Sequence, residues 1–150
     1  MSVLGIVVVP NGKHPKVHAA VLSGTLSAPT LNDSFQLTPT AVEPSEQAVE
    51  LAELLSAKLT SVMSVAAIRI AGNPPVARRY KAQFSRAHCE GALLFVLRRH
   101  TQREVGTIVP AGLAKSRGMK SDAFEALLAQ LTSGKVNAEA VRAGLAMLPN

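Results

Sequence analysis

An arginine stands inside the apolar segment VAAIRIAGNPP, residues 65–75, which otherwise has the pattern of a buried β-strand followed by a turn. A charged side chain in such a run is normally paired, functional, or placed at a strand end with its head group in solvent. The guanidinium of Arg69 is suited to a carboxylate or a phosphate, to which it can donate two parallel hydrogen bonds. The chemistry to expect there is ion pairing or anion binding.

The basic residues form three groups, each in a predicted loop or at a predicted helix start. The chain has 16 Lys and Arg against 10 Asp and Glu, a net charge of +6, which favours a polyanionic partner. Contact with phosphates is one interpretation of these groups, and an ordinary solvated surface is the other. The groups are Lys13, His14 and Lys16; Arg78, Arg79, Lys81 and Arg86; and Lys115, Arg117 and Lys120.

Two aromatic residues, Tyr80 and Phe84, lie among the second basic group and are candidates for a base or partner contact. Only 3% of the chain is aromatic, which argues against tight single-strand binding by base stacking. The four histidines lack zinc-ligand spacing, and the single cysteine excludes an intramolecular disulfide and a cysteine-cluster metal site. No metal site and no cofactor are therefore expected from the residues alone.

The length of 150 residues fits a single domain, 1–150. No apolar run approaches the roughly 20 residues that span a bilayer, and MSVLGIVVVPNG lacks the features of a signal peptide. We therefore expect a soluble, cytoplasmic protein with no membrane partner.

The hydrophobic pattern predicts three strands, then helices that alternate with strands. The first helix is expected to have Ser45 as its N-cap and to turn Val49 inward, and the last helix to be capped by Asn137. This order indicates an α/β fold in which a three-strand antiparallel meander and parallel strands form a mixed five-stranded sheet, with helices on both faces. The predicted strands are 2–9, 16–24, 34–40, 64–72 and 104–112; the predicted helices are 44–62, 85–101, 121–134 and 137–148; 25–34 and 113–120 are predicted loops.

Five segments, taken in order, resemble the ribonuclease H-like superfamily and within it the RuvC-like branch, the Holliday-junction resolvases. The resemblance covers nearly the whole chain and implies a ribonuclease H-like fold. The segments are VLGI at 3–6, VAAIRI at 65–70, RAHCEGALLFVLRR at 86–99, GMKSDAFEALLAQL at 118–131 and NAEAVRAGLAML at 137–148.

The resemblance implies hydrolysis of phosphodiesters by two divalent ions, which four acidic residues hold. One acid belongs on the first strand, one on the fourth, and two, spaced three apart, on the last helix. The matching positions are Val7, Arg69, Glu139 and Arg142, so at most one acid is retained. Two readings of Arg69 stay open: an ion pair with Glu139 in the vacated site, or a solvent-reaching strand-end arginine. Glu139 and Arg142 are also spaced for an ordinary helical salt bridge.

The sequence therefore favours a catalytically inactive, RuvC-like domain that binds nucleic acid by shape and charge, DNA rather than RNA. Its expected contacts are the basic residues of the three groups together with Tyr80. A protein-interaction or regulatory module without nucleic-acid binding is the first alternative. An active Mg²⁺-dependent endonuclease whose acids are not recognised is the second, and Mg²⁺ would be its only cofactor. A homodimer is expected because the five apolar residues 93–97, LLFVL, point to more than one side of the predicted helix, and the core of one chain covers only one of these sides. RuvC-like resolvases are also two-fold dimers.

Overall fold

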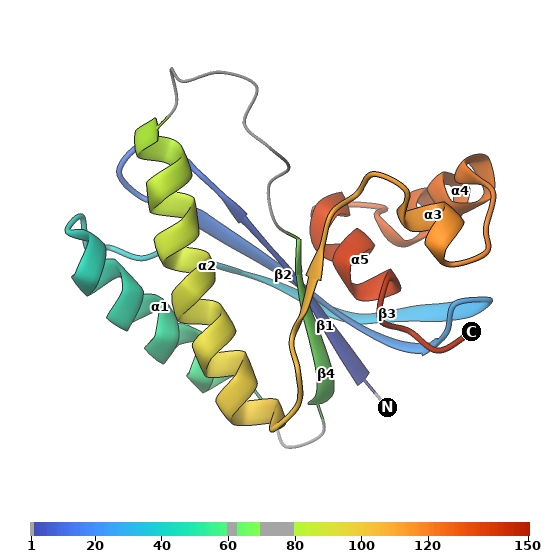
Figure 1. Ribbon diagram of the computed structural model, residues 1–150, viewed down its shortest axis with the longest axis horizontal. Coiled ribbons are helices and arrows are strands. Elements are labelled where there is room, and N and C mark those ends of the chain that lie inside the picture. The colour runs from blue at the N-terminus through green and yellow to red at the C-terminus, as the bar shows by residue number, and fades with distance from the viewer. Residues whose placement is uncertain (1, 60–62, 70–79) are drawn as a thin grey trace.

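The computed structural model describes residues 2–59, 63–69 and 80–150, and only the backbone of residues 63, 64, 69, 80 and 81. The described residues form one mixed sheet in the order β3-β2-β1-β4-β5 (Figure 1). Strands β1, β2 and β3 make an antiparallel meander, and β4 and β5 continue parallel to β1, as the sequence predicts. The strands are β1 (Ser2–Val9), β2 (Lys16–Thr25), β3 (Ala28–Leu37), β4 (Met63–Arg69) and β5 (Gly106–Ile108).

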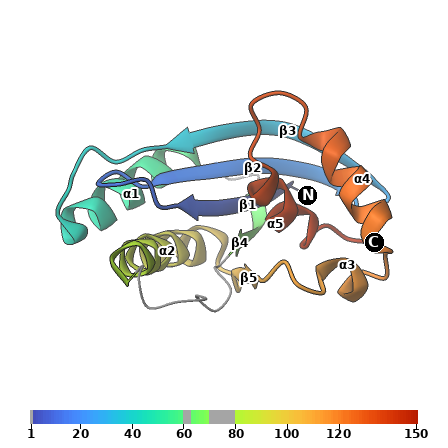
Figure 2. The ribbon, with the colours of Figure 1, turned by 90° about the horizontal axis from the view of Figure 1, so that it is seen from above.

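Helices cover both faces of this sheet (Figures 1 and 2). One face packs against α1 and α2, and the other against α3, α4 and α5. This arrangement confirms the predicted α/β architecture. The helices are α1 (Pro44–Lys58), α2 (Tyr80–Thr101), α3 (Leu113–Ser116), α4 (Ser121–Leu131) and α5 (Ala138–Leu145).

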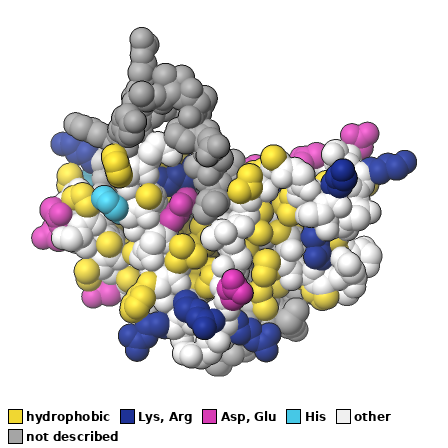
Figure 3. All heavy atoms as spheres, in the orientation of Figure 1, with side chains coloured by type: hydrophobic (Ala, Val, Ile, Leu, Met, Phe, Trp, Pro, Cys, Tyr) yellow, Lys and Arg dark blue, Asp and Glu magenta, His cyan; other side chains and the backbone are white. Residues whose placement is uncertain are grey.

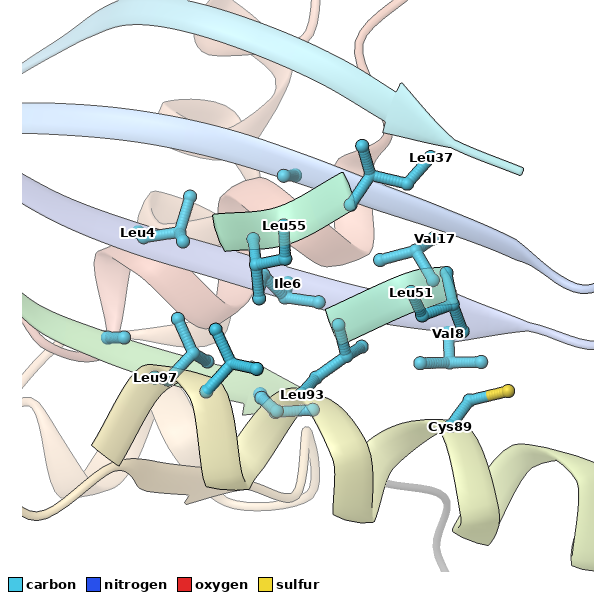
Figure 4. Packing of buried hydrophobic residues seen from close by; sticks show 14 residues of the cluster. Leu4, Ile6, Val8, Val17, Leu37, Leu51, Leu55, Cys89, Leu93 and Leu97 are labelled. Carbon is cyan, nitrogen blue, oxygen red and sulfur yellow. The ribbon is translucent and has the colours of Figure 1, made fainter. Parts of the chain in front are cut away.

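The central strand β1 is buried on both faces because alternate side chains point to opposite sides of a sheet. Leu4, Ile6 and Val8 pack towards α1 and α2, where Cys89 of α2 joins the same cluster (Figure 4). Val3 and Val7 instead pack in the cluster that contains α5. The sheet therefore carries two separate cores, and residues of odd number on β1 face the last helix.

Helix α5 lies unusually close to β1 because glycines occupy both sides of the contact. A Cβ built on Gly5 would lie 2.0 Å from the carbonyl oxygen of Ala140 and 2.4 Å from the backbone nitrogen of Gly144. A Cβ on Gly144 would lie 2.3 Å from Leu22 Cδ1. The contact at Gly5 involves backbone atoms, which cannot move aside as the end of a side chain can. Gly5 therefore sets the distance between the sheet and the last helix.

Several element boundaries differ from the predicted ones. Strand β3 begins at Ala28, inside the predicted loop 25–34, because an edge strand with one exposed side accepts polar residues. Strand β5 keeps only three of the residues predicted for it. Helix α2 begins at Tyr80, before the predicted start, and the short α3 lies in the predicted loop 113–120.

The start of α1 also differs from the prediction. Glu43, not Ser45, is the N-cap, and its carboxylate accepts the Glu46 N–H at 3.0 Å. Val49 is 59% exposed, so its predicted inward position is wrong. Gln47 takes a buried place on this helix instead. Asn137 is confirmed as the N-cap of α5, since its side chain accepts from the backbone N–H groups of Glu139 and Ala140.

We expect Gly5→Ala to destabilise the fold by about 3 kcal/mol or more, because its methyl group meets backbone atoms of α5. Gly91→Ala is the matched control, since a Cβ on this exposed residue of α2 meets nothing within 4 Å. Removing a glycine from a helix interior should raise stability there by roughly 0.5–1 kcal/mol. Urea unfolding of both variants measures the difference, and equal stability of the two would contradict the close contact.

Candidate functional site

The strand positions that the family resemblance assigns to two acids lie side by side. Val7 of β1 pairs with Arg69 of β4 on one side and with His18 of β2 on the other. The row continues to Gln36 on β3 and to Ile108 on β5. The backbone therefore brings the predicted site positions on β1 and β4 together.

Val7 is 2% exposed and belongs to the apolar cluster under α5. An aliphatic side chain in this place has no donor atom for a metal ion. The side chain of Arg69 lies outside the described residues, and so does its predicted pair with Glu139. The ion pair between Arg69 and Glu139 therefore stays a prediction, and so does the alternative of a strand-end arginine that reaches solvent.

Glu139 and Arg142 form the helical salt bridge that was one of their two interpretations. Arg142 Nε donates to Glu139 Oε1 at 3.3 Å. The same guanidinium donates to both carboxylate oxygens of Glu125 on α4, at 2.5 and 3.2 Å. It also lies over the Phe124 ring, 6.0 Å from the ring centre. Arg142 therefore joins α4 to α5, whatever else Glu139 contacts.

The charges of this cluster stabilise one another. The hydrogen bond from Arg142 lowers the pKa of Glu125, and the hydrogen bond to Glu125 raises the pKa of Arg142. The positions of α5 that face β1 are instead Ala140 and Gly144. Helix α5 thus presents its small residues to the strand that carries Val7.

The first basic group lies on the hairpin between β1 and β2, which two polar contacts hold in place. Gln47 Nε2 donates to the carbonyl oxygens of Lys13 at 2.6 Å and Ala41 at 2.8 Å. His14 Nδ1 lies 3.1 Å from the Pro39 carbonyl oxygen. The Lys13 side chain is exposed and that of Lys16 is partly exposed. The hairpin is anchored through buried atoms while its charges stay accessible.

The second basic group is only partly described. Arg78 and Arg79, and the side chains of Tyr80 and Lys81, lie outside the described residues. Arg86 donates to Glu90 at 2.8 Å, within α2. Its charge is therefore shared with a carboxylate, and its predicted phosphate contact stays a prediction.

The third group divides between free and engaged side chains. Lys115 on α3 and Lys120 before α4 are exposed. Arg117 is partly buried and donates through Nη2 to the carbonyl oxygen of Leu148 and, at 3.0 Å, to Asn150 Oδ1. Arg117 thus connects α3 to the end of the chain. This structural role limits its use as a nucleic-acid contact, which stays a prediction.

The structure also shows a basic surface that the sequence reasoning missed. Arg98, Arg99 and Arg103 are exposed at the C-terminal end of α2. Lysine and arginine side chains gather there, at the lower edge of the face in Figure 3. The spacing RRHTQR was visible in the sequence, but cations are common at helix C-termini, where they interact favourably with the helix dipole.

No group of three His, Cys, Asp or Glu side chains that could hold a metal ion occurs among the described residues. The helices of this part of the chain are also too short or too polar to cross a membrane. Of the four positions that the resemblance assigns to acids, Glu139 is the one that carries a carboxylate.

The sequence and the structure of the chain were each compared with those of known proteins. No sequence model of a protein family matches the chain, and neither does any curated protein sequence. Thermus thermophilus RuvC in complex with a Holliday junction substrate is similar in structure, with a TM-score of 0.71 at 12% identity over 97% of this chain and 91% of that one. A second T. thermophilus RuvC structure gives 0.67 at 14% identity, over 97% and 92%. Fowlpox virus Holliday junction resolvase gives 0.45 at 13%, over 97% and 95%.

The chain therefore has a ribonuclease H-like fold. More closely, the two T. thermophilus RuvC structures are similar to it over 97% of the chain, which confirms the fold resemblance found in the sequence. At 12–14% identity, the structural similarity defines the fold, and any activity has to be argued from the residues of this chain.

We expect Gln47→Met to destabilise the domain by about 1–3 kcal/mol, because it leaves the carbonyl oxygens of Lys13 and Ala41 without their donor. Gln130→Met on the exposed side of α4 is the control and should change stability by no more than about 0.5 kcal/mol. Urea unfolding measures the stability. Amide hydrogen exchange of residues 11–16 should rise in Gln47→Met alone, and unchanged exchange there would show that Gln47 does not hold the hairpin.

Proposed function

We propose that this domain binds nucleic acid, DNA rather than RNA, through a RuvC-like fold that lacks metal-dependent cleavage. The observation that carries the proposal is the strand register. The two strand positions to which the resemblance assigns acids pair with each other, and they hold Val7 and Arg69. A site for two Mg²⁺ ions needs carboxylate oxygens at such positions.

Electrostatics explains why these replacements oppose catalysis. Val7 removes a ligand without adding charge. An arginine in a ligand position places a cation ~4 Å from a divalent ion, a repulsion of several kcal/mol even at an effective dielectric near 20. Compared with a site of four acids, these positions offer fewer carboxylate ligands, and one of them carries a positive charge in place of a negative one.

We expect no cleavage of four-way junction, duplex or hybrid substrates by the purified chain in Mg²⁺ or Mn²⁺. Gel analysis of labelled substrates measures this, with a mock purification as the background. Calorimetry should likewise detect no pair of bound Mn²⁺ ions. Cleavage above the mock that Glu139→Gln abolishes would instead support an active nuclease with unrecognised acids.

Cations that are exposed or partly exposed support the proposal that the domain binds nucleic acid. Lys13 and Lys16 lie at the β1–β2 hairpin, and Lys115 and Lys120 lie on α3 and at the start of α4, on the other side of α5 in Figure 1. Phosphate contacts from such groups give affinity without sequence preference, and they release counterions. Binding by shape and charge should therefore weaken steeply as salt is added.

We expect the double variant Lys13→Glu/Lys16→Glu to bind a junction or duplex at least about tenfold more weakly, and to reduce the slope of log affinity against log salt by roughly 2. Arg98→Glu/Arg103→Glu, at the C-terminal end of α2, is the control with the same charge change and should bind nearly as the parent does. Equal losses in both variants would indicate attraction by net charge and not a defined interface.

A protein-interaction module is the second candidate function, and the surface of α2 favours it. Leu93, Val96 and Leu97 are buried in the core, which accounts for most of the apolar run. Phe95 and Phe84 are 62% and 57% exposed on the same helix. The predicted homodimer would cover such a surface. A chain that shows no salt-dependent gel shift with any nucleic acid but associates through this surface would have this function instead.

A further inference from the structure

A polar pocket lies beside the row of residues that contains Val7. It has a volume of about 240 Å³ and is lined by residues of β2, β3 and the connection between α4 and α5. In Figure 2 this connection lies near β3. His18, which pairs with Val7 in the sheet, lines it from β2. The other lining residues are Ala19, Ser34, Phe35, Gln36, Lys135, Val136 and Asn137.

The polar groups that line this pocket mostly donate hydrogen bonds. Lys135 contributes an ammonium group with three donors. Asn137 uses its Oδ1 to cap α5, so its amide NH₂ is the part left for a ligand. Gln36 Nε2 donates one of its two N–H groups to Thr38 Oγ1, and the second N–H can donate to a ligand. The hydroxyl of Ser34 and the ring of His18 can each donate as well.

The charge of the pocket is positive. None of the described residues that line it is an Asp or a Glu. Lys135 lines the pocket together with His18, and Lys16, two residues away along β2, acts on His18 electrostatically. Burial is the main cause that lowers the pKa of His18, and the nearby charge of Lys16 lowers it further. The ring is therefore largely neutral near pH 7 in the unbound domain. Donors and cations without carboxylates favour an anionic ligand rich in acceptor atoms.

From this lining we infer a site that binds a phosphate group directly, without a metal ion, between β2, β3 and the α4–α5 connection. A phosphate presents several acceptor oxygens, which suits the ammonium, amide and hydroxyl donors around the pocket. The volume is sufficient for a phosphate with part of an attached sugar. The site rests on the proposed function in one respect: the phosphate would be that of a nucleic acid bound along the same face of the sheet.

The test follows the imidazole signals of the four histidines by NMR in the full chain. The ligands are sodium phosphate, a short DNA duplex with 5′-phosphates and the same duplex without them, each compared with sodium chloride at equal ionic strength. We expect phosphate to shift the His18 signal and to raise its titration midpoint, because an anion stabilises the imidazolium. His88 and His100 on α2, across the sheet, should not move.

Lys135→Gln should weaken phosphate binding at His18 roughly tenfold, the effect of losing one charge-assisted hydrogen bond. Arg103→Gln, exposed beyond the end of α2, is the control with the same charge change and should leave binding unchanged. Asn137 is kept intact in both variants, because its Oδ1 caps α5.

The two duplexes separate the sources of the phosphate. A shift with both duplexes assigns the pocket to backbone phosphodiesters, and a shift only with the phosphorylated one assigns it to a chain end. A His18 signal that no ligand moves overturns the phosphate site, even if the duplex binds through the lysines of the hairpin. A response to inorganic phosphate that Lys135→Gln weakens, without binding of any duplex, supports the site and overturns the proposed function.

Discussion

The contact between the backbones of β1 and α5 determines the geometry of one whole face of the sheet. It exists because Gly5 and Gly144 lack side chains where the helix crosses the strand. At this short distance Ala140 and Val141 pack directly against the apolar side of β1 and β2. The connection before α5 is then held over β2 and β3. A bulkier residue at Gly5 would lift the helix and, with it, everything that approaches the sheet from this side.

On β3, β2 and β1, the row of residues that contains Val7 has no carboxylate. A cluster of carboxylates repels itself and needs cations to hold it together. Here the row across β3, β2 and β1 contains Gln36, His18 and Val7. These residues are neutral near pH 7 and need no ion to stay close. The cation–π and ion-pair contacts of Arg142 add a link between α4 and α5.

The sequence predicted the elements whose signal is local. The apolar strands β1, β2 and β4, and the order of the helices, followed from alternation and helical spacing, and the resemblance placed positions 7 and 69 next to each other. The start of β3 was missed because an edge strand tolerates the polar residues that also make loops. Val49 was predicted to face inward because helical periodicity assigns apolar residues to the buried side of a helix. It could not show that Gln47 is buried instead, where its amide donates to two carbonyl oxygens.

The parts of the site that sequence reasoning missed depend on contacts between distant segments. The phosphate-sized pocket combines residues of β2 and β3 with Lys135 and Asn137. Nothing in their local spacing indicates that they meet. Arg117 looked like a surface cation, yet the end of the chain folds back to accept its hydrogen bonds. Pairings of this kind are set by packing, which a single sequence does not display.

The buried position of Cys89 has a practical consequence for studying the domain in solution. Its side chain is 1% exposed, and burial, followed by the nearby Glu90, raises the pKa of the thiol to about 11. Only about one molecule in ten thousand carries the reactive thiolate at pH 7. The chain has no other cysteine. A cysteine introduced on the exposed hairpin would therefore react with a fluorophore selectively, and optical labelling needs no prior removal of the native thiol.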